Sequence, residues 1–234
     1  MDEKAQPQRF DMEQEFWALS GRCDNYTMTS IERRYALWRA VRYVVRNRIP
    51  GDLVECGVWR GGSSMMAAFT FLTEGDSSRT LWLYDTFEGM TAPTGRDIHI
   101  QSGQSARKLL DRQDPLPGSH IWGIAALDEV KRNMRSTGYP AEKLVFRKGP
   151  VEETLRDAKP HAVSILRLDT DWYESTLVEL HQLWPKLVRS GVLIIDDYGW
   201  WKGQRDAVDE FFGSMQPSPY LSRVDVAGAI VIKP

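Results

Sequence analysis

Four carboxylates follow two short apolar segments of the sequence. Leu166-Arg-Leu168 leads into Asp169 and Asp171, and Ile194-Ile195 leads directly into Asp196 and Asp197. If the two segments are neighbouring strands of a parallel sheet, these like charges must share protons or recruit a cation. Oxygen ligands suit a hard divalent ion, Mg²⁺ first and Mn²⁺ or Ca²⁺ next, and the lack of a nearby His or Cys argues against zinc. The cluster therefore predicts a metal site, with capping of a helix or turn as the simpler alternative.

A metal at this position can bind a substrate oxygen, lower its pKa and orient it. A carboxylate outside the ligand set can then take up the proton. Asp171, two residues beyond Asp169, is the candidate for this role.

A glycine-rich segment, Glu55-Cys-Gly-Val-Trp-Arg-Gly-Gly-Ser-Ser64, links an expected strand to an expected helix. Glycines let a ligand approach the backbone, and the N–H groups that begin a helix can hold a carboxylate. The spacing of Gly57, Gly61 and Gly62 differs from G-x-G-x-x-G and leaves room for a bulkier ligand. Glu55 offers a charge for a cationic amine, so the segment suits an amino-acid group. The alternative is a turn that only packs the helix on the strand.

A second acidic residue, Asp85, ends the next expected strand, 28 residues after Gly57. Nucleotide-binding α/β proteins place the carboxylate that bonds a ribose diol near this position. Capping of the following turn is the alternative. Together with the glycine segment, Asp85 favours a nucleoside that carries an amino acid over a dinucleotide.

Strands and helices alternate along the chain. Helical periodicity covers 30–48; strands are expected at 52–57, 80–85, 144–148, 163–168, 192–195 and 229–232, and further helices after Gly62 and at 126–134, 173–187 and 207–215. This order predicts a doubly wound, mostly parallel α/β sheet with helices on both faces, an N-terminal helical extension, and ligands at the carboxyl ends of its strands.

The segment from Gly89 to about Ser119 fits no regular element, apart from a short helix near 106–110. A loop of this length is usually a lid, a binding loop or a disordered insertion. Because it directly follows a strand end, we expect a lid. Within it, His99 is expected to be exposed rather than in contact with a substrate, and Trp200-Trp201 could equally line an acceptor pocket or pack.

Composition limits the class of protein. The 234 residues suit one large domain, with residues 1–25 as a tail and lead-in and the domain from 26 to 234. The net charge of −2 gives no footprint for nucleic acid, and neither a signal peptide nor a membrane span is expected. Cys23 and Cys56 form no disulfide framework, which favours a reducing cytoplasm.

As a set, these motifs resemble the macrocin O-methyltransferase (TylF-like) family. The resemblance extends from about Tyr26 to Phe212. It rests on Tyr26-Thr-Met-Thr-Ser30, the glycine-rich segment, Tyr84-Asp-Thr-Phe-Glu-Gly-Met90, Leu168-Asp-Thr-Asp-Trp-Tyr173 and Asp196-Asp-Tyr-Gly199. It implies a class I methyltransferase sheet that binds S-adenosylmethionine and Mg²⁺ and methylates sugar hydroxyls of natural products.

The resemblance also implies roles for single residues and a partner. Asp169, Asp196 and Asp197 match the metal ligands, and Asp171 matches the general base of some members. The expected donor contacts are Thr29, Glu55, Gly57, Ser63 and Asp85. The acceptor would be a small glycosylated molecule, and a homodimer or larger homo-oligomer is implied.

Two alternatives stay open at this point. A catechol-type O-methyltransferase would share the donor, the metal and the strand-end aspartates but take a flat aromatic acceptor. A non-catalytic S-adenosylmethionine-binding subunit would share the fold, although it would have no use for the paired carboxylates.

Overall fold

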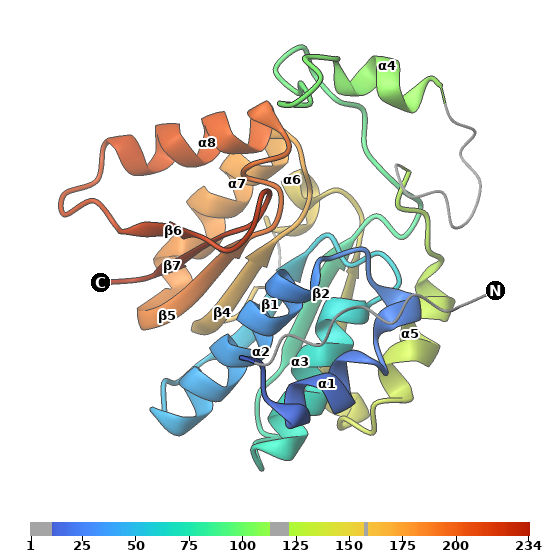
Figure 1. The fold of residues 1–234 in the computed structure, drawn as a ribbon, viewed down its shortest axis with the longest axis vertical. Coiled ribbons are helices and arrows are strands. Elements are labelled where there is room, and N and C mark those ends of the chain that lie inside the picture. The colour runs from blue at the N-terminus through green and yellow to red at the C-terminus, as the bar shows by residue number, and fades with distance from the viewer. Residues whose placement is uncertain (1–10, 113–121, 157–158) are drawn as a thin grey trace.

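A seven-stranded sheet forms the centre of the fold, which a computed structural model describes for residues 11–112, 122–156 and 159–234 (Figure 1). The strand order is β3-β2-β1-β4-β5-β7-β6. The first five strands are parallel, whereas β7 runs antiparallel to β5 and β6 antiparallel to β7. The strands are β1 Asp52–Cys56, β2 Leu81–Asp85, β3 Leu144–Lys148, β4 Val163–Leu168, β5 Leu187–Ile195, β6 Leu221–Arg223 and β7 Ala229–Ile232. The expected doubly wound, mostly parallel sheet is confirmed.

Helices cover both faces of the sheet (Figure 1). They are α1 Gln14–Ser20, α2 Ile31–Arg46, α3 Gly62–Thr73, α4 Ala106–Leu110, α5 Leu127–Arg135, α6 Val151–Thr154, α7 Tyr173–Leu183 and α8 Lys202–Gly213. Alternate strand residues point to opposite faces. Leu53 therefore packs with α2 and α3, whereas its neighbour Val54 packs with α7 and α8. The two cores hold the strand ends, and so the site, in place.

Several expected elements differ at their ends. The helix predicted over 173–187 is α-helical only to Leu183 and continues as a 3-10 turn over Trp184–Lys186, because Pro185 has no N–H to extend the α-helical hydrogen bonds. Strand β5 begins earlier than expected, at Leu187, and α8 begins at Lys202. The short elements α6 and β6 lack enough residues to show a periodic pattern, so they were not predicted.

The lead-in to the domain contains the helix α1, for which the sequence predicted no bounds. Phe16 of α1 is fully buried and lies edge-on to Tyr35 of α2, with a ring-centroid distance of 5.1 Å. Residues 11–25 are therefore part of the folded domain, while the expected tail at 1–10 lies outside the described residues.

The sequence also predicted that the two cysteines form no disulfide framework and that no segment spans a membrane. Cys23 and Cys56 are both buried and free, so they form no disulfide. Within the described ranges, no helix is both long and apolar enough to span a membrane.

Candidate active site

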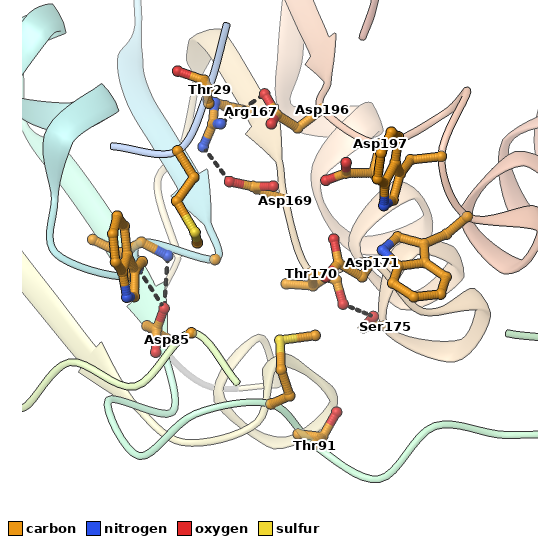
Figure 2. Close-up of a pocket in the computed structure, with 18 of the residues that line it drawn as sticks. Thr29, Asp85, Thr91, Arg167, Asp169, Thr170, Asp171, Ser175, Asp196 and Asp197 are labelled. Carbon is orange, nitrogen blue, oxygen red and sulfur yellow. Dashed lines mark hydrogen bonds and ion pairs between the residues drawn. The ribbon is translucent and has the colours of Figure 1, made fainter. Parts of the chain in front are cut away.

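A cavity of about 760 Å³ opens at the carboxyl ends of β1, β2, β4 and β5 (Figure 2). Asp85 lies on one side of it and the aspartates that follow β4 and β5 lie on the other. Eight of the nine predicted site residues line it, namely Thr29, Gly57, Ser63, Asp85, Asp169, Asp171, Asp196 and Asp197. The remaining one, Glu55, does not.

The glycine-rich segment passes very close to the loop after β4. Gly57 has φ of +82°, and a Cβ at this position would lie 2.0 Å from the carbonyl oxygen of Asp169. Only glycine fits both the backbone conformation and the space. The glycine-rich loop after β1 (the donor loop, 57–62) and the loop after β4 that carries Asp169 and Asp171 (the acidic loop) are thus in direct contact.

Asp85 fixes the shape of this segment. One oxygen, Oδ2, accepts hydrogen bonds from the backbone N–H groups of Val58 at 2.6 Å and Trp59 at 3.0 Å. The other, Oδ1, accepts from the N–H of Phe87 at 2.6 Å. Burial raises the pKa of Asp85, although these hydrogen bonds oppose the shift. The carboxylate therefore caps the turn after β2, as the simpler alternative had it, and it also faces the cavity.

The segment 26–30 closes the cavity on the side of α3. The carbonyl oxygen of Tyr26 lies close enough to Gly62 that a Cβ there would be 2.4 Å away. The hydroxyls of Thr27 and Thr29 are 2.9 Å apart. Ser30 then caps α2 by accepting from the N–H of Arg33. Thr29 is thereby held at the cavity wall next to the start of α3.

Glu55 lies beneath the cavity floor and not in its wall. Its register partner on β4 is Arg167, whose Nη1 donates to Oε1 of Glu55 at 2.6 Å. The second oxygen of Glu55 accepts from the hydroxyl of Ser64. The sequence predicted neither contact, because the register of β1 against β4 and the position of α3 on β1 are set only in the folded chain. Once β1 and β4 are known to be neighbours, the pairing of Glu55 with Arg167 in register indicates a buried ion pair.

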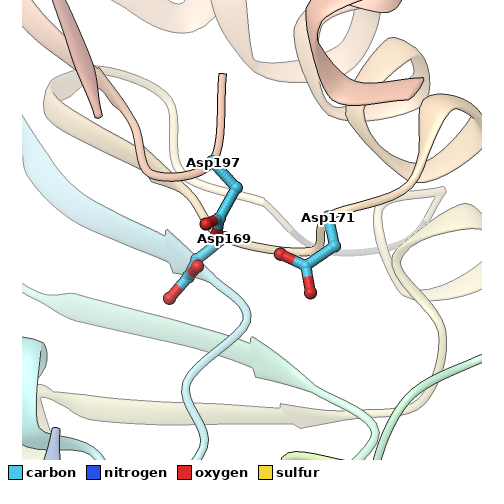
Figure 3. Close-up of side chains that lie close together, drawn as sticks. All are labelled: Asp169, Asp171 and Asp197. Carbon is cyan, nitrogen blue, oxygen red and sulfur yellow. The ribbon is translucent and has the colours of Figure 1, made fainter. Parts of the chain in front are cut away.

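The side chains of three aspartates lie close together at the ends of β4 and β5 (Figure 3). In Asp169, Asp171 and Asp197, one oxygen of each lies within 4.8 Å of the others. Burial, followed by the charges of neighbouring aspartates, raises the pKa of Asp171 to about 8. Burial also raises the pKa values of Asp169 and Asp197. An all-oxygen set of this kind, in which ionisation of each group disfavours that of the next, fits a hard divalent cation.

Asp196 differs from the other three because arginines contact both of its oxygens. Oδ1 lies 2.6 Å from Nη2 of Arg167, and Oδ2 accepts from Nη1 of Arg33. Arg33 also donates to Asp225 at 3.1 Å, and the hydroxyl of Ser30 reaches the same carboxylate at 2.6 Å. Arg33 therefore links the start of α2, the end of β5 and the turn between β6 and β7.

The predicted lid is anchored over the cavity at one end. Asp97 is fully buried and accepts from the N–H of Tyr173, at the start of α7, at 2.9 Å. Backbone hydrogen bonds then join Ile98 to Lys202 and Ile100 to Trp200. The expected short helix is confirmed as α4, and the expected lid residues 113–119 lie outside the described residues.

His99 lies in this anchored part and corrects an expectation. Its ring packs edge-on to Trp200 and Trp201, with centroid distances of 4.7 and 5.7 Å, and it lines the cavity. The sequence favoured an exposed histidine, because it could not show that the lid pairs with the residues after Asp197. Of the two tryptophans, Trp201 is buried against Trp172, while Trp200 is 41% exposed at the cavity.

The strand order, the glycine loop after β1 and the acidic end of β2 define a class I methyltransferase. Solved structures agree: the O-methyltransferase NovP superimposes with a TM-score of 0.75 and 33% identity, covering 89% of this chain and 82% of that one. The calicheamicin methyltransferase CalS11, at 16% identity and a TM-score of 0.64, shares the fold over 99% of both chains.

The chain belongs to the macrocin-O-methyltransferase (TylF) family, whose sequence model matches residues 2–233. It is 35% identical over 203 residues to 8-demethyl-8-(2,3-dimethoxy-alpha-L-rhamnosyl)-tetracenomycin-C 4'-O-methyltransferase of Streptomyces olivaceus, covering 87% of this chain and 74% of the relative. It is 34% identical, with the same coverage, to demethyldecarbamoylnovobiocin O-methyltransferase of Streptomyces niveus. The protein is therefore an S-adenosylmethionine-dependent O-methyltransferase.

Proposed function

We propose that this enzyme methylates a sugar hydroxyl of a glycosylated natural product and requires Mg²⁺. The observation that carries the proposal is the position of the three facing aspartates, which open into the same cavity as the glycine loop and Asp85. Two relatives support a sugar acceptor, because their names specify a rhamnosyl-tetracenomycin and mycinamicin III. The second of these shows 31% identity over 74% of this chain.

The donor is proposed to bind between the glycine loop and the segment 26–30. Backbone N–H groups at the start of α3, next to Ser63, suit the carboxylate of the methionine group. Asp85 suits the ribose diol through Oδ1, which accepts one backbone hydrogen bond and keeps a lone pair, whereas Oδ2 already accepts two. Thr29 faces the same space. Glu55 acts from beneath, through Arg167, and is proposed to support the donor loop.

Asp169 and Asp197 are proposed as metal ligands, with Asp196 as the third. The ion, when bound, supplies a positive charge that lowers the pKa of the acceptor hydroxyl. Asp171 is proposed to accept the proton, because its carboxylate lines the same cavity and lies beside Asp169 and Asp197. Holding donor and acceptor in one cavity supplies the alignment that the transfer requires.

A second assignment of the third ligand rests on a specific observation. Asp171 belongs to the facing group, whereas Asp196 already pairs with Arg33 and Arg167. In this alternative, Asp171 completes the metal site and Asp196 neutralises the arginines. Calorimetric titration of Mg²⁺ into Asp171→Asn and Asp196→Asn separates the two, because only the true ligand's variant loses affinity, by about 10- to 100-fold or more.

The test of the whole proposal is methyl transfer from labelled S-adenosylmethionine to a panel of glycosides, with EDTA and with Mg²⁺ restored. Turnover that survives EDTA would contradict the metal requirement. Preference for catechol over every glycoside would favour the catechol-type alternative. Donor binding without transfer to any acceptor would favour the non-catalytic subunit.

The assembly and location of the enzyme stay predictions. The family resemblance implies a homodimer or larger homo-oligomer, and the free buried thiols are compatible with a reducing cytoplasm. No binding of nucleic acid is expected from the balanced charge. Light scattering coupled to gel filtration measures the oligomeric state directly.

A further inference from the structure

Three exposed apolar side chains surround the mouth of the cavity. Met28 is 44% exposed, Trp200 41% and Val226 72%, and all three line the cavity. Single exposed apolar residues are ordinary on a protein surface, but several around one opening indicate a binding surface. Three other large apolar residues of the described chain, Leu72, Tyr220 and Ile232, are also exposed but do not line it.

Hydrogen bonds join the three segments that carry these residues. The hydroxyl of Ser30, next to the segment of Met28, donates to Asp225 at 2.6 Å. The N–H of Gly199 donates to the carbonyl of Ala227 at 2.7 Å. A Cβ at Gly199 would lie 2.0 Å from the carbonyl oxygen of Val226, so the two loops are in contact. Met28, Trp200 and Val226 therefore belong to one continuous surface around the mouth, which we call the rim.

The size of the cavity limits what it can enclose. Pockets for one drug-sized ligand measure roughly 300–1,000 Å³. A cavity of about 760 Å³ that holds the donor and a sugar ring leaves little space for anything larger. A substituent on that sugar must then extend past the mouth, where the rim lies.

Charge decides which substituent fits. The arginines among the described lining residues are Arg33 and Arg167, and both already pair with carboxylates. Neither is available to neutralise the diphosphate of a nucleotide-activated sugar, which would also lie near the aspartates. An uncharged apolar group gains instead by covering the exposed surface of Trp200 and its neighbours.

We propose that Met28, Trp200 and Val226 form a rim that holds the apolar aglycone of the acceptor outside the cavity. The proposal rests on the proposed sugar acceptor and deepens it, since it assigns specificity to these residues. It also places the reaction after glycosyl transfer to the aglycone, because the free or nucleotide-linked sugar lacks the group that the rim contacts.

The test is calorimetric binding to the enzyme loaded with Mg²⁺ and S-adenosylhomocysteine. Methyl and 2-naphthyl glycosides of L-rhamnose, D-glucose and D-galactose form matched pairs, with dTDP-rhamnose as the charged competitor. We expect a naphthyl glycoside to bind at least about tenfold more tightly than its methyl partner. Trp200→Ala should reduce that ratio by about two- to tenfold, and Trp200→Leu by less.

Tyr220→Ala is the matched control, because it removes an exposed aromatic ring away from the cavity and should leave the ratio unchanged. The rim proposal would be overturned if naphthyl and methyl glycosides bound equally in every pair, or if Tyr220→Ala lowered the ratio as much as Trp200→Ala. Tighter binding of dTDP-rhamnose than of the naphthyl glycosides would overturn it as well. Methyl transfer to the methyl glycosides in the labelled-donor assay would still support the proposed function. Failure of the rim is thus distinguished from failure of the function.

Discussion

Arg167 and Glu55 form a buried ion pair beneath the donor loop, with 2.6 Å between Nη1 and Oε1. They are register partners on β4 and β1, and each side chain is almost completely buried. The same guanidinium contacts Asp169 at 2.8 Å and Asp196 at 2.6 Å. One side chain on β4 therefore connects the support of the donor loop with the acidic end of the sheet.

Arg167→Met should destabilise the protein strongly. Removing one member of a buried ion pair leaves an uncompensated buried charge and costs about 3–5 kcal/mol of unfolding free energy. Urea unfolding measures the loss. Arg39→Met is the control, because Arg39 is 60% exposed in its pair with Glu13 and should contribute less than about 1 kcal/mol. Equal stability of both variants would contradict the role of Arg167.

Gly57→Ala should abolish donor binding or folding. The new Cβ would lie 2.0 Å from the carbonyl of Asp169 at a φ of +82°, so the glycine loop and the acidic loop must separate. Thermal unfolding and calorimetric binding of S-adenosylhomocysteine measure the two effects. Gly213→Ala, at a helix end with nothing within 4 Å of the new Cβ, should leave donor affinity unchanged and should not lower the unfolding temperature. Wild-type affinity in Gly57→Ala would refute the close approach.

Asp97→Asn should loosen the lid. One carboxylate oxygen accepts from the N–H of Thr94 at 2.6 Å and the other from the N–H of Tyr173 at 2.9 Å. An asparagine has only one accepting oxygen, so one of these two hydrogen bonds must be lost. Replacing an acceptor by a donor there should cost about 1–3 kcal/mol. Faster tryptic cleavage after Arg107 and Lys108 reports the opening. Cleavage in Asp111→Asn, which changes an exposed aspartate of the same segment, should stay at the wild-type rate.

Neither cysteine should react in the folded protein. Cys23 and Cys56 are fully buried. Burial raises the pKa of Cys23 to about 12 and that of Cys56 well above its ordinary value, so almost no thiolate exists at pH 8. Iodoacetamide should add no mass until urea unfolds the chain, and two adducts afterwards. Rapid labelling of the native protein would mean that one of these sites opens locally.

Local sequence determined the elements and the ends of the strands. Apolar segments bounded by glycine, proline or aspartate predicted β1 to β4 within a residue or two, and helical periodicity over 30–48 predicted α2. The carboxyl ends of parallel strands share one edge of a sheet, so the positions of Asp85, Asp169 and Asp197 at a common cavity followed from the alternation of strands and helices.

Only the tertiary structure decided which charged and aromatic side chains contact one another. Register between β1 and β4 assigned Glu55 to Arg167, and the position of α2 brought Arg33 to Asp196. Pairing of the lid with the segment after β5 moved His99 from an expected surface position to the cavity. Such contacts join residues far apart in the chain, and their free energy depends on burial and distance. A single sequence specifies residue types locally, whereas only the folded chain sets those two quantities.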